Sequence, residues 1–171
     1  MASPIILYME LDWKKYLKEA YLKAQEGTNP STQNGAILIN DKGEVLVAEK
    51  NNFSDNVAET PERLSVKPTR YRYGVHAERN VIYRAAKAGI KTNGLTMVCS
   101  WAACMDCAQG IIQSGIKRLV THKQALDRSG NWQDEIDTAF AMLREAGVEI
   151  IIYDGSIGIG KVLRSGEHWE P

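Results

Sequence analysis

Short apolar runs alternate with helical patterns through the second half of the sequence, and this alternation constrains the fold more than any other feature. Segments with helical spacing of apolar residues separate three β-rich runs, which are LTMVCS, KRLVTH and VEIIIYD. We expect helices over about residues 77–88, 105–114 and 133–146. Strands that alternate with helices of this length indicate βαβ crossovers, which cover both faces of a sheet with helices.

A helical stripe and a hairpin precede this alternation. Apolar residues lie on one helical face before Gly27, so we expect a helix over about residues 11–26. Two β-rich runs follow, NPSTQNGAILIN and GEVLVAEK. The link Asn40–Gly43 between them has hairpin chemistry, so the two strands are antiparallel neighbours. The two halves together predict the α/β class, as a three-layer α/β/α sandwich around a mixed sheet of about five strands.

Length and charge exclude several classes of protein. A chain of 171 residues can bury one core and is short for two, so we expect a single domain whose residues from about 155 to 171 form a C-terminal extension. Twenty-one basic residues balance 21 acidic ones, which argues against a nucleic-acid partner. No apolar run approaches the roughly 20 residues that cross a bilayer. The segment 1–8 is too short and lacks the basic flank of a signal peptide. We therefore expect a cytoplasmic protein with no membrane partner.

Residues 50–75 form a long connection with no sustained period. The segment carries two prolines and leads directly into His76. An irregular connection of this length inside a compact domain is usually functional or disordered. We expect an irregular loop that faces a substrate.

One histidine and a C-x-x-C pair lie at the predicted helix N-termini, where proteins of this fold class have their active sites. His76 opens one predicted helix, and Cys104 and Cys107 open the next. Sites in α/β sheets lie beyond the carboxyl ends of strands, where helix N-termini converge and favour thiolate over thiol. One imidazole and two thiolates suit Zn²⁺, and three protein ligands leave a fourth position for water, which indicates catalysis.

Glu78 follows His76 by two positions in the same predicted helix. Side chains two apart point in different directions on a helix, so Glu78 is a poor ligand for the same ion but can exchange protons with water there. Each motif alone has an ordinary alternative, namely a satisfied histidine, a redox pair or a structural zinc site. The order of the motifs and their placement at helix starts together favour a catalytic metal site over these alternatives. Cys99, in a predicted strand, is expected to be a small buried hydrophobe.

Three segments, HAERNVIYRAA, CMDCAQGIIQSGIKRLV and NPSTQNGAILI, resemble the cytidine and deoxycytidylate deaminase superfamily, whose signature is H-A-E followed by P-C-x-x-C. The similarity runs from about residue 12 to 154 and is nearest to the deoxycytidylate deaminase branch. The resemblance implies a cytidine deaminase-like fold, a Zn²⁺ ion held by His76, Cys104 and Cys107, and proton transfer by Glu78. It implies hydrolytic deamination of a free cytosine nucleotide, with dCMP to dUMP plus ammonia favoured. A deaminase of tRNA adenosine or guanine, and a non-catalytic zinc-binding module, remain as alternatives.

The resemblance also implies substrate contacts and an assembly. Asn51, or Asn52 if the register shifts by one, corresponds to a residue that contacts the sugar. The other expected contacts are Gly35, Ala36 and Ser100 beside the base, Ala77 and Trp101 at the pocket, and Arg63 and Arg72, with Lys67 and Arg70, at a 5′-phosphate. The basic residues could instead simply solvate a loop. Ala103 replaces the usual proline, which changes no ligand. Active sites near subunit interfaces in this family lead us to expect a homo-oligomer.

Overall fold

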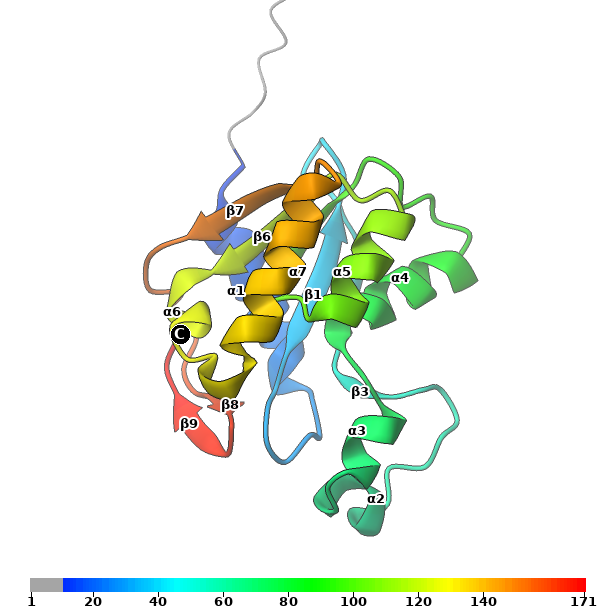
Figure 1. Cartoon of the computed structure of the whole chain (residues 1–171), viewed down its shortest axis with the longest axis vertical. Coiled ribbons are helices and arrows are strands. Elements are labelled where there is room, and N and C mark those ends of the chain that lie inside the picture. The colour runs from blue at the N-terminus through cyan, green and yellow to red at the C-terminus, as the bar shows by residue number, and fades with distance from the viewer. Residues whose placement is uncertain (1–10) are drawn as a thin grey trace, which may run out of the picture.

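A five-stranded mixed sheet lies at the centre of the computed structural model, which describes residues 11–171 (Figure 1). The strands, in spatial order, are β2 (Val45–Lys50), β1 (Gly35–Ile39), β5 (Thr96–Cys99), β6 (Arg118–His122) and β7 (Glu149–Tyr153). β1 is antiparallel to both of its neighbours, whereas β5, β6 and β7 are parallel. The predicted fold class and hairpin are confirmed.

Helices cover both faces of this sheet. The longer ones are α1 (Trp13–Gln25), α4 (Ala77–Lys87), α5 (Met105–Gln113) and α7 (Gln133–Glu145), and shorter turns are α6 (Lys123–Leu126) and η1 (Gly130–Trp132). Strand β1 shows how the layers arise, because side chains alternate across a strand. Ala36 and Leu38 join the core under α4, α5 and α7, while Ile37 and Ile39 join the core under α1.

A C-terminal hairpin completes the α1 face. It consists of β8 (Val162–Arg164) and β9 (Glu167–Trp169), which pair in antiparallel fashion. Val162 and Trp169 are buried in the same core as the apolar face of α1. Figure 1 shows the hairpin at the lower left of the view, below α6. No helix within residues 11–171 is both long enough and apolar enough to span a bilayer.

The start of β1 lies beside the end of β5 because the two strands are antiparallel. Ala36 pairs with Cys99, and the Ser100 amide donates to the Gly35 carbonyl at 2.9 Å. A Cβ atom at Gly35 would overlap the Ala20 carbonyl of α1, so this position requires glycine. The polar residues just before β1 and just after β5 therefore meet at one edge of the sheet.

The prediction of an irregular connection over residues 50–75 is wrong in part. The segment contains β3 (Asn52–Phe53), α2 (Pro61–Ser65), α3 (Thr69–Tyr73) and β4 (Gly74–Val75). Its prolines begin helices and do not interrupt them, since Pro61 opens α2 behind the Thr60 cap and Pro68 precedes α3. β3 pairs with β4, so the connection returns to its starting point directly before His76.

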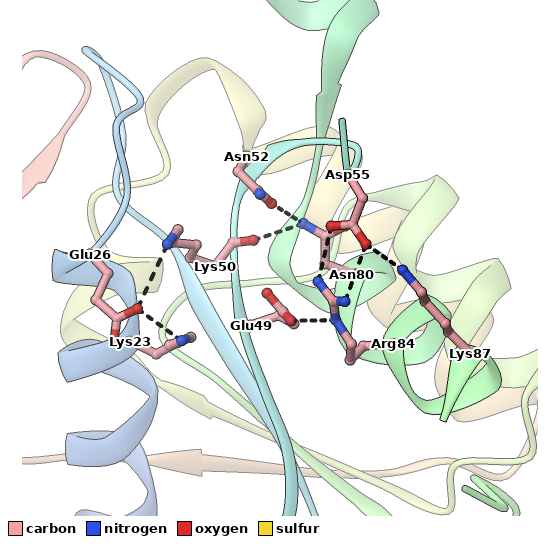
Figure 2. Close-up of polar contacts among 9 residues, drawn as sticks. All are labelled: Lys23, Glu26, Glu49, Lys50, Asn52, Asp55, Asn80, Arg84 and Lys87. Atoms are coloured by element: carbon pink, nitrogen blue, oxygen red, sulfur yellow. Dashed lines mark hydrogen bonds and ion pairs between the residues drawn. The ribbon is translucent and has the colours of Figure 1, made fainter. Parts of the chain in front are cut away.

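The outer surface of α4 is tied to β2 and to the start of this connection by the polar network of Figure 2. Arg84 donates to Glu49 at 2.8 Å and to Asp55 at 3.1 Å, and Lys87 donates to Asp55 at 2.8 Å. The Asn80 amide donates to the last carbonyl of β2 at 2.8 Å. These contacts set the position of α4, whose first turn carries the candidate site.

Candidate active site

Three metal-ligating atoms converge at two helix N-termini. His76 is the N-cap of α4, Cys104 is the N-cap of α5, and Cys107 lies in the first turns of α5. His76 Nδ1 lies 3.3 Å from Cys104 Sγ and 3.5 Å from Cys107 Sγ, and all three atoms lie within 4.8 Å of one another. A zinc tetrahedron with ordinary Zn–N and Zn–S bonds has nitrogen–sulfur edges of about 3.5 Å. The donor set and its spacing fit Zn²⁺.

The ligand atoms of the cluster shift one another's pKa. A hydrogen bond with Cys107, followed by one with His76, lowers the pKa of Cys104 to about 4. The hydrogen bond with the Cys104 thiolate raises the pKa of Cys107, and the hydrogen bond with Cys104 also raises the pKa of His76. Metal ligands must be deprotonated, so binding of a divalent ion would release the protons carried by the two cysteines and by the ligand nitrogen of His76.

Glu78 lies beside the cluster with one carboxylate oxygen held in place. Its side chain is 1% exposed. Oε1 accepts from Asn34 Nδ2 at 3.3 Å and from the Cys99 thiol at 3.2 Å, while Oε2 lies 3.8 Å from Cys107 Sγ. Burial raises the pKa of the Glu78 carboxyl, and the nearby His76 opposes this shift. The carboxyl is thus a group that can hold a proton next to a metal.

Asn34 is a central residue of the site to which the sequence assigned no role. It is buried directly before β1; its Nδ2 donates to Glu78, and its Oδ1 accepts from the Ser100 hydroxyl at 2.6 Å. Its backbone amide donates to Asn51 Oδ1 at 2.8 Å. Its sequence signal is its place in NPSTQNGAILI, as the polar residue immediately before the fully apolar run GAILI. Cys99 is buried as expected, but its thiol also contacts the carboxylate of Glu78.

A cavity of about 210 Å³ opens onto this cluster. His76, Cys104 and Glu78 line one part of it. Other parts are lined by the aromatic rings of Trp101 and Trp132, by Lys67 and Arg70 from the connection, and by polar residues before β1 and in the C-terminal hairpin. The cavity therefore combines a metal site, a buried acid, two indoles and two cations.

The structure brings some of the expected substrate contacts to this cavity. Asn51 and Trp101 line it, and so do Lys67 and Arg70. Both ends of the Asn51 side chain bind backbone, since Oδ1 accepts from an amide at 2.8 Å and Nδ2 donates to the Thr32 carbonyl at 2.8 Å. Asn51 thus also shapes the segment that precedes β1.

Other expected contacts lie behind the cavity wall or away from it. Four of them are buried and do not line it, namely Gly35, Ala36, Ala77 and Ser100. Arg63 and Arg72 lie outside it: Arg63 donates to the Ala58 carbonyl and its guanidinium lies 4.6 Å from the centre of the Tyr73 ring, while Arg72 is exposed. The basic residues that reach the cavity are Lys67 and Arg70.

Comparison with known proteins identifies similar sequences and a similar fold. Residues 11–123 match the family described as the cytidine and deoxycytidylate deaminase zinc-binding region. A deoxycytidylate deaminase of Mus musculus is 32% identical over 116 residues, which are 64% of this chain and 64% of the mouse protein. A deoxycytidylate deaminase of Pongo abelii is 30% identical over 144 residues, which are 81% of this chain and 78% of that protein.

A solved structure shares the architecture. The dCMP deaminase from the cyanophage S-TIM5, in complex with dCMP and dUMP, superposes with a TM-score of 0.67 at 24% identity. The match covers 85% of this chain and 99% of the cyanophage chain. At this identity the likeness establishes the fold.

Proposed function

Since this chain belongs to the cytidine and deoxycytidylate deaminase family, we propose that it hydrolyses dCMP to dUMP and ammonia with Zn²⁺ as its metal. The chain is a hydrolytic deaminase that acts on a carbon–nitrogen bond. One observation carries the proposal: the buried carboxyl of Glu78 lies beside the cluster of His76, Cys104 and Cys107 and lines the same cavity as His76 and Cys104.

The three ligands and Glu78 have separate roles in the mechanism. His76, Cys104 and Cys107 would hold Zn²⁺, and the ion would supply a Lewis acid that activates water near neutral pH. Two donors hold Oε1 of Glu78, which leaves Oε2 directed toward the cluster. Oε2 is therefore the atom that receives a proton from the attacking water. Glu78 delivers that proton to the ring nitrogen next to C4, then takes the proton of the hydroxyl group now on C4 and passes it to the amino group, which leaves as ammonia. A new C–O bond thus replaces the C4–N bond.

The cavity supports a phosphorylated substrate. Arg70 is 6% exposed, and its Nη1 donates to the Leu64 carbonyl at 3.2 Å, so its guanidinium is oriented. Lys67 lies three residues earlier and lines the same cavity. An oriented guanidinium and a nearby ammonium bind a phosphate monoester well. These two residues are the proposed 5′-phosphate contacts, and Trp101 and Trp132 form an aromatic wall suited to a base.

The alternative of a structural zinc site is disfavoured by the number of ligands. Structural zinc normally has four protein ligands. In the part of the chain from residue 11 onward, the ligand group contains only His76, Cys104 and Cys107. Three ligands match a catalytic site. The balanced net charge of the chain likewise favours a free nucleotide over tRNA.

A panel assay tests the proposed function directly. Ammonia release is measured from dCMP, deoxycytidine, dCTP, cytidine, CMP and guanine, and zinc is quantified on the same sample. We expect turnover of dCMP well above that of deoxycytidine, because only the nucleotide engages Lys67 and Arg70. Preferential release from guanine, or no release by a zinc-loaded chain, would contradict the proposal.

We also propose three coarser properties of the protein. A single domain is supported by the burial of Val162 and Trp169 against α1, and one calorimetric unfolding transition is expected. A homo-oligomer is expected from the resemblance to a family whose active sites lie near subunit interfaces, and light scattering measures the mass. A cytoplasmic location is supported by three cysteines without disulfides, and cell fractionation checks it.

A further inference from the structure

The C-terminal hairpin places a buried cation against the aromatic wall of the cavity. Arg164, the last residue of β8, is 4% exposed. Its Cζ lies 4.2 Å from the centre of the Trp101 ring. None of its three guanidinium nitrogens donates a hydrogen bond to any residue among 11–171. A buried charge without hydrogen-bond partners lowers the stability of the folded protein. Arg164 is therefore a candidate for a role other than stabilising the fold.

Trp101 connects this cation to the cavity. The indole lines the cavity, and its Nε1 donates to Ser129 Oγ at 3.1 Å. Its ring meets that of Trp132, which also lines the cavity, edge to face at 6.4 Å and 84°. Arg164 therefore contacts one of the two rings that form the aromatic wall, while Ser129 fixes the nitrogen edge of the same ring.

The hairpin also reaches the cavity through the residue that follows Arg164. Ser165 lines the cavity, and its backbone amide donates to Thr32 Oγ1 at 3.1 Å. This contact anchors the hairpin to the segment that leads into β1. Burial lowers the pKa of Arg164 to about 10, which leaves the guanidinium charged at neutral pH. A charged guanidinium over an indole face makes a cation–π contact that is stronger when desolvated.

We propose that Arg164 is a positioning residue for substrate affinity: its guanidinium holds the Trp101 ring, and through it the aromatic wall against which the cytosine nucleotide binds. The inference rests on the proposed function and deepens it, since it assigns part of the affinity to the C-terminal hairpin. A purely structural role would be served better by an apolar side chain of similar length. Methionine at this position would remove the uncompensated charge, so we expect it to keep or raise the melting temperature.

Arg128 provides a matched control in the same region. Its Cζ lies 4.9 Å from the centre of the Trp169 ring, so it also makes an arginine–indole contact with the hairpin. Trp169 stacks on His122 and packs in the core under α1, and neither Arg128 nor Trp169 lines the cavity. Arg128→Met therefore removes the same kind of contact at a ring that does not line the cavity.

The test compares steady-state kinetics of zinc-loaded wild type, Arg164→Met, Arg164→Lys and Arg128→Met with dCMP. We expect Arg164→Met to raise KM about tenfold, with kcat changed less than about twofold. Arg164→Lys should restore part of the affinity because it keeps a cation, and Arg128→Met should leave KM unchanged. An equal rise of KM in Arg164→Met and Arg128→Met, or no rise in Arg164→Met, would overturn the inference.

A double-mutant cycle with Trp101→Leu shows whether Arg164 acts through the indole. If it does, Arg164→Met changes KM less than about twofold in the Trp101→Leu background. A full effect of Arg164→Met in that background would overturn the inference. Tryptophan emission, measured without substrate, adds an independent readout. Arg164→Met should change this emission in the wild-type background but not in the Trp101→Leu background. The absence of this difference would count against the inference. Lack of dCMP turnover by the wild type would count against the proposed function alone.

Discussion

Two walls of one cavity are built on different principles. The metal wall consists of side chains at two helix N-termini, where Glu78 and the three ligands contact one another. The hairpin wall consists of Trp101 backed by Arg164, whose nitrogens have no hydrogen-bond partner among residues 11–171. The metal wall is made by local motifs, whereas the hairpin wall exists only after the C-terminal hairpin has packed against Trp101. We expect the first to control the chemical step and the second to control affinity.

Removal of a metal ligand should have the largest effect of the changes considered, and it should act on the metal wall alone. Cys107→Ala deletes a fully buried thiolate from the three-ligand set. We expect loss of zinc and of measurable deamination, because two ligands hold zinc poorly at neutral pH. Metal analysis and ammonia release check both outcomes. Retention of one zinc per chain with activity would show that the cluster has been assigned wrongly.

Glu78→Gln should separate metal binding from proton transfer. The amide keeps the size of the side chain but cannot accept a proton from water, so kcat should fall about a thousandfold. Zinc content should stay at the wild-type level because Glu78 is outside the ligand group. Glu49→Gln is the matched control, since Glu49 pairs with Arg84 on the outer face of α4 and should keep full activity. Turnover by Glu78→Gln near the wild-type rate would refute the acid–base role.

Asn34→Ala tests how far the metal wall depends on its support. The change removes the amide donor to Glu78 Oε1 and leaves the Ser100 hydroxyl without its acceptor. We expect kcat to fall about tenfold to a hundredfold, with a loss of about 1–3 kcal/mol in the free energy of unfolding. Kinetics and urea unfolding measure the two effects. Wild-type kcat in this variant would mean that Cys99 alone orients the carboxylate.

Changes at the outer surface of α4 should have the smallest effect on kcat and on stability. Arg84→Ala breaks the ion pairs with Glu49 and Asp55 that Figure 2 shows, and the Arg84 side chain is 40% exposed. Exposed pairs of this kind contribute about 0–1 kcal/mol. We expect a small loss of stability, partly reproduced by high salt in the wild type, and unchanged kcat. A large loss of activity would show that this network transmits strain to the first turn of α4.

Local patterns account for what could be predicted from the sequence. The strands of the central sheet and the long helices follow from periodicity, and the cluster of His76, Cys104 and Cys107 follows from motifs within single segments. The five-residue helices α2 and α3 were missed because they are too short to produce a period. Arg70 lines the cavity and Arg72 does not, because residues two apart on a helix point in different directions.

Long-range packing accounts for what could not be predicted. Asn34 gains its role only because antiparallel pairing of β1 with β5 brings it beside Ser100 and Glu78. Arg164 reaches Trp101 only through the fold of the C-terminal hairpin. Asn34 lies in a segment that resembles the family and Arg164 lies in no motif, and nothing near either residue in the sequence indicates its partner.

X-ray absorption at the zinc edge tests the central claim most directly, because it counts the ligands of the metal in the intact enzyme. The account predicts two sulfur atoms at about 2.3 Å, one imidazole nitrogen at about 2.0 Å and one additional light atom from solvent. Addition of a cytosine nucleotide should alter only the light-atom shell. A shell with four protein donors, or one with fewer than two sulfur atoms, would contradict the assignment of His76, Cys104 and Cys107 as an open catalytic site.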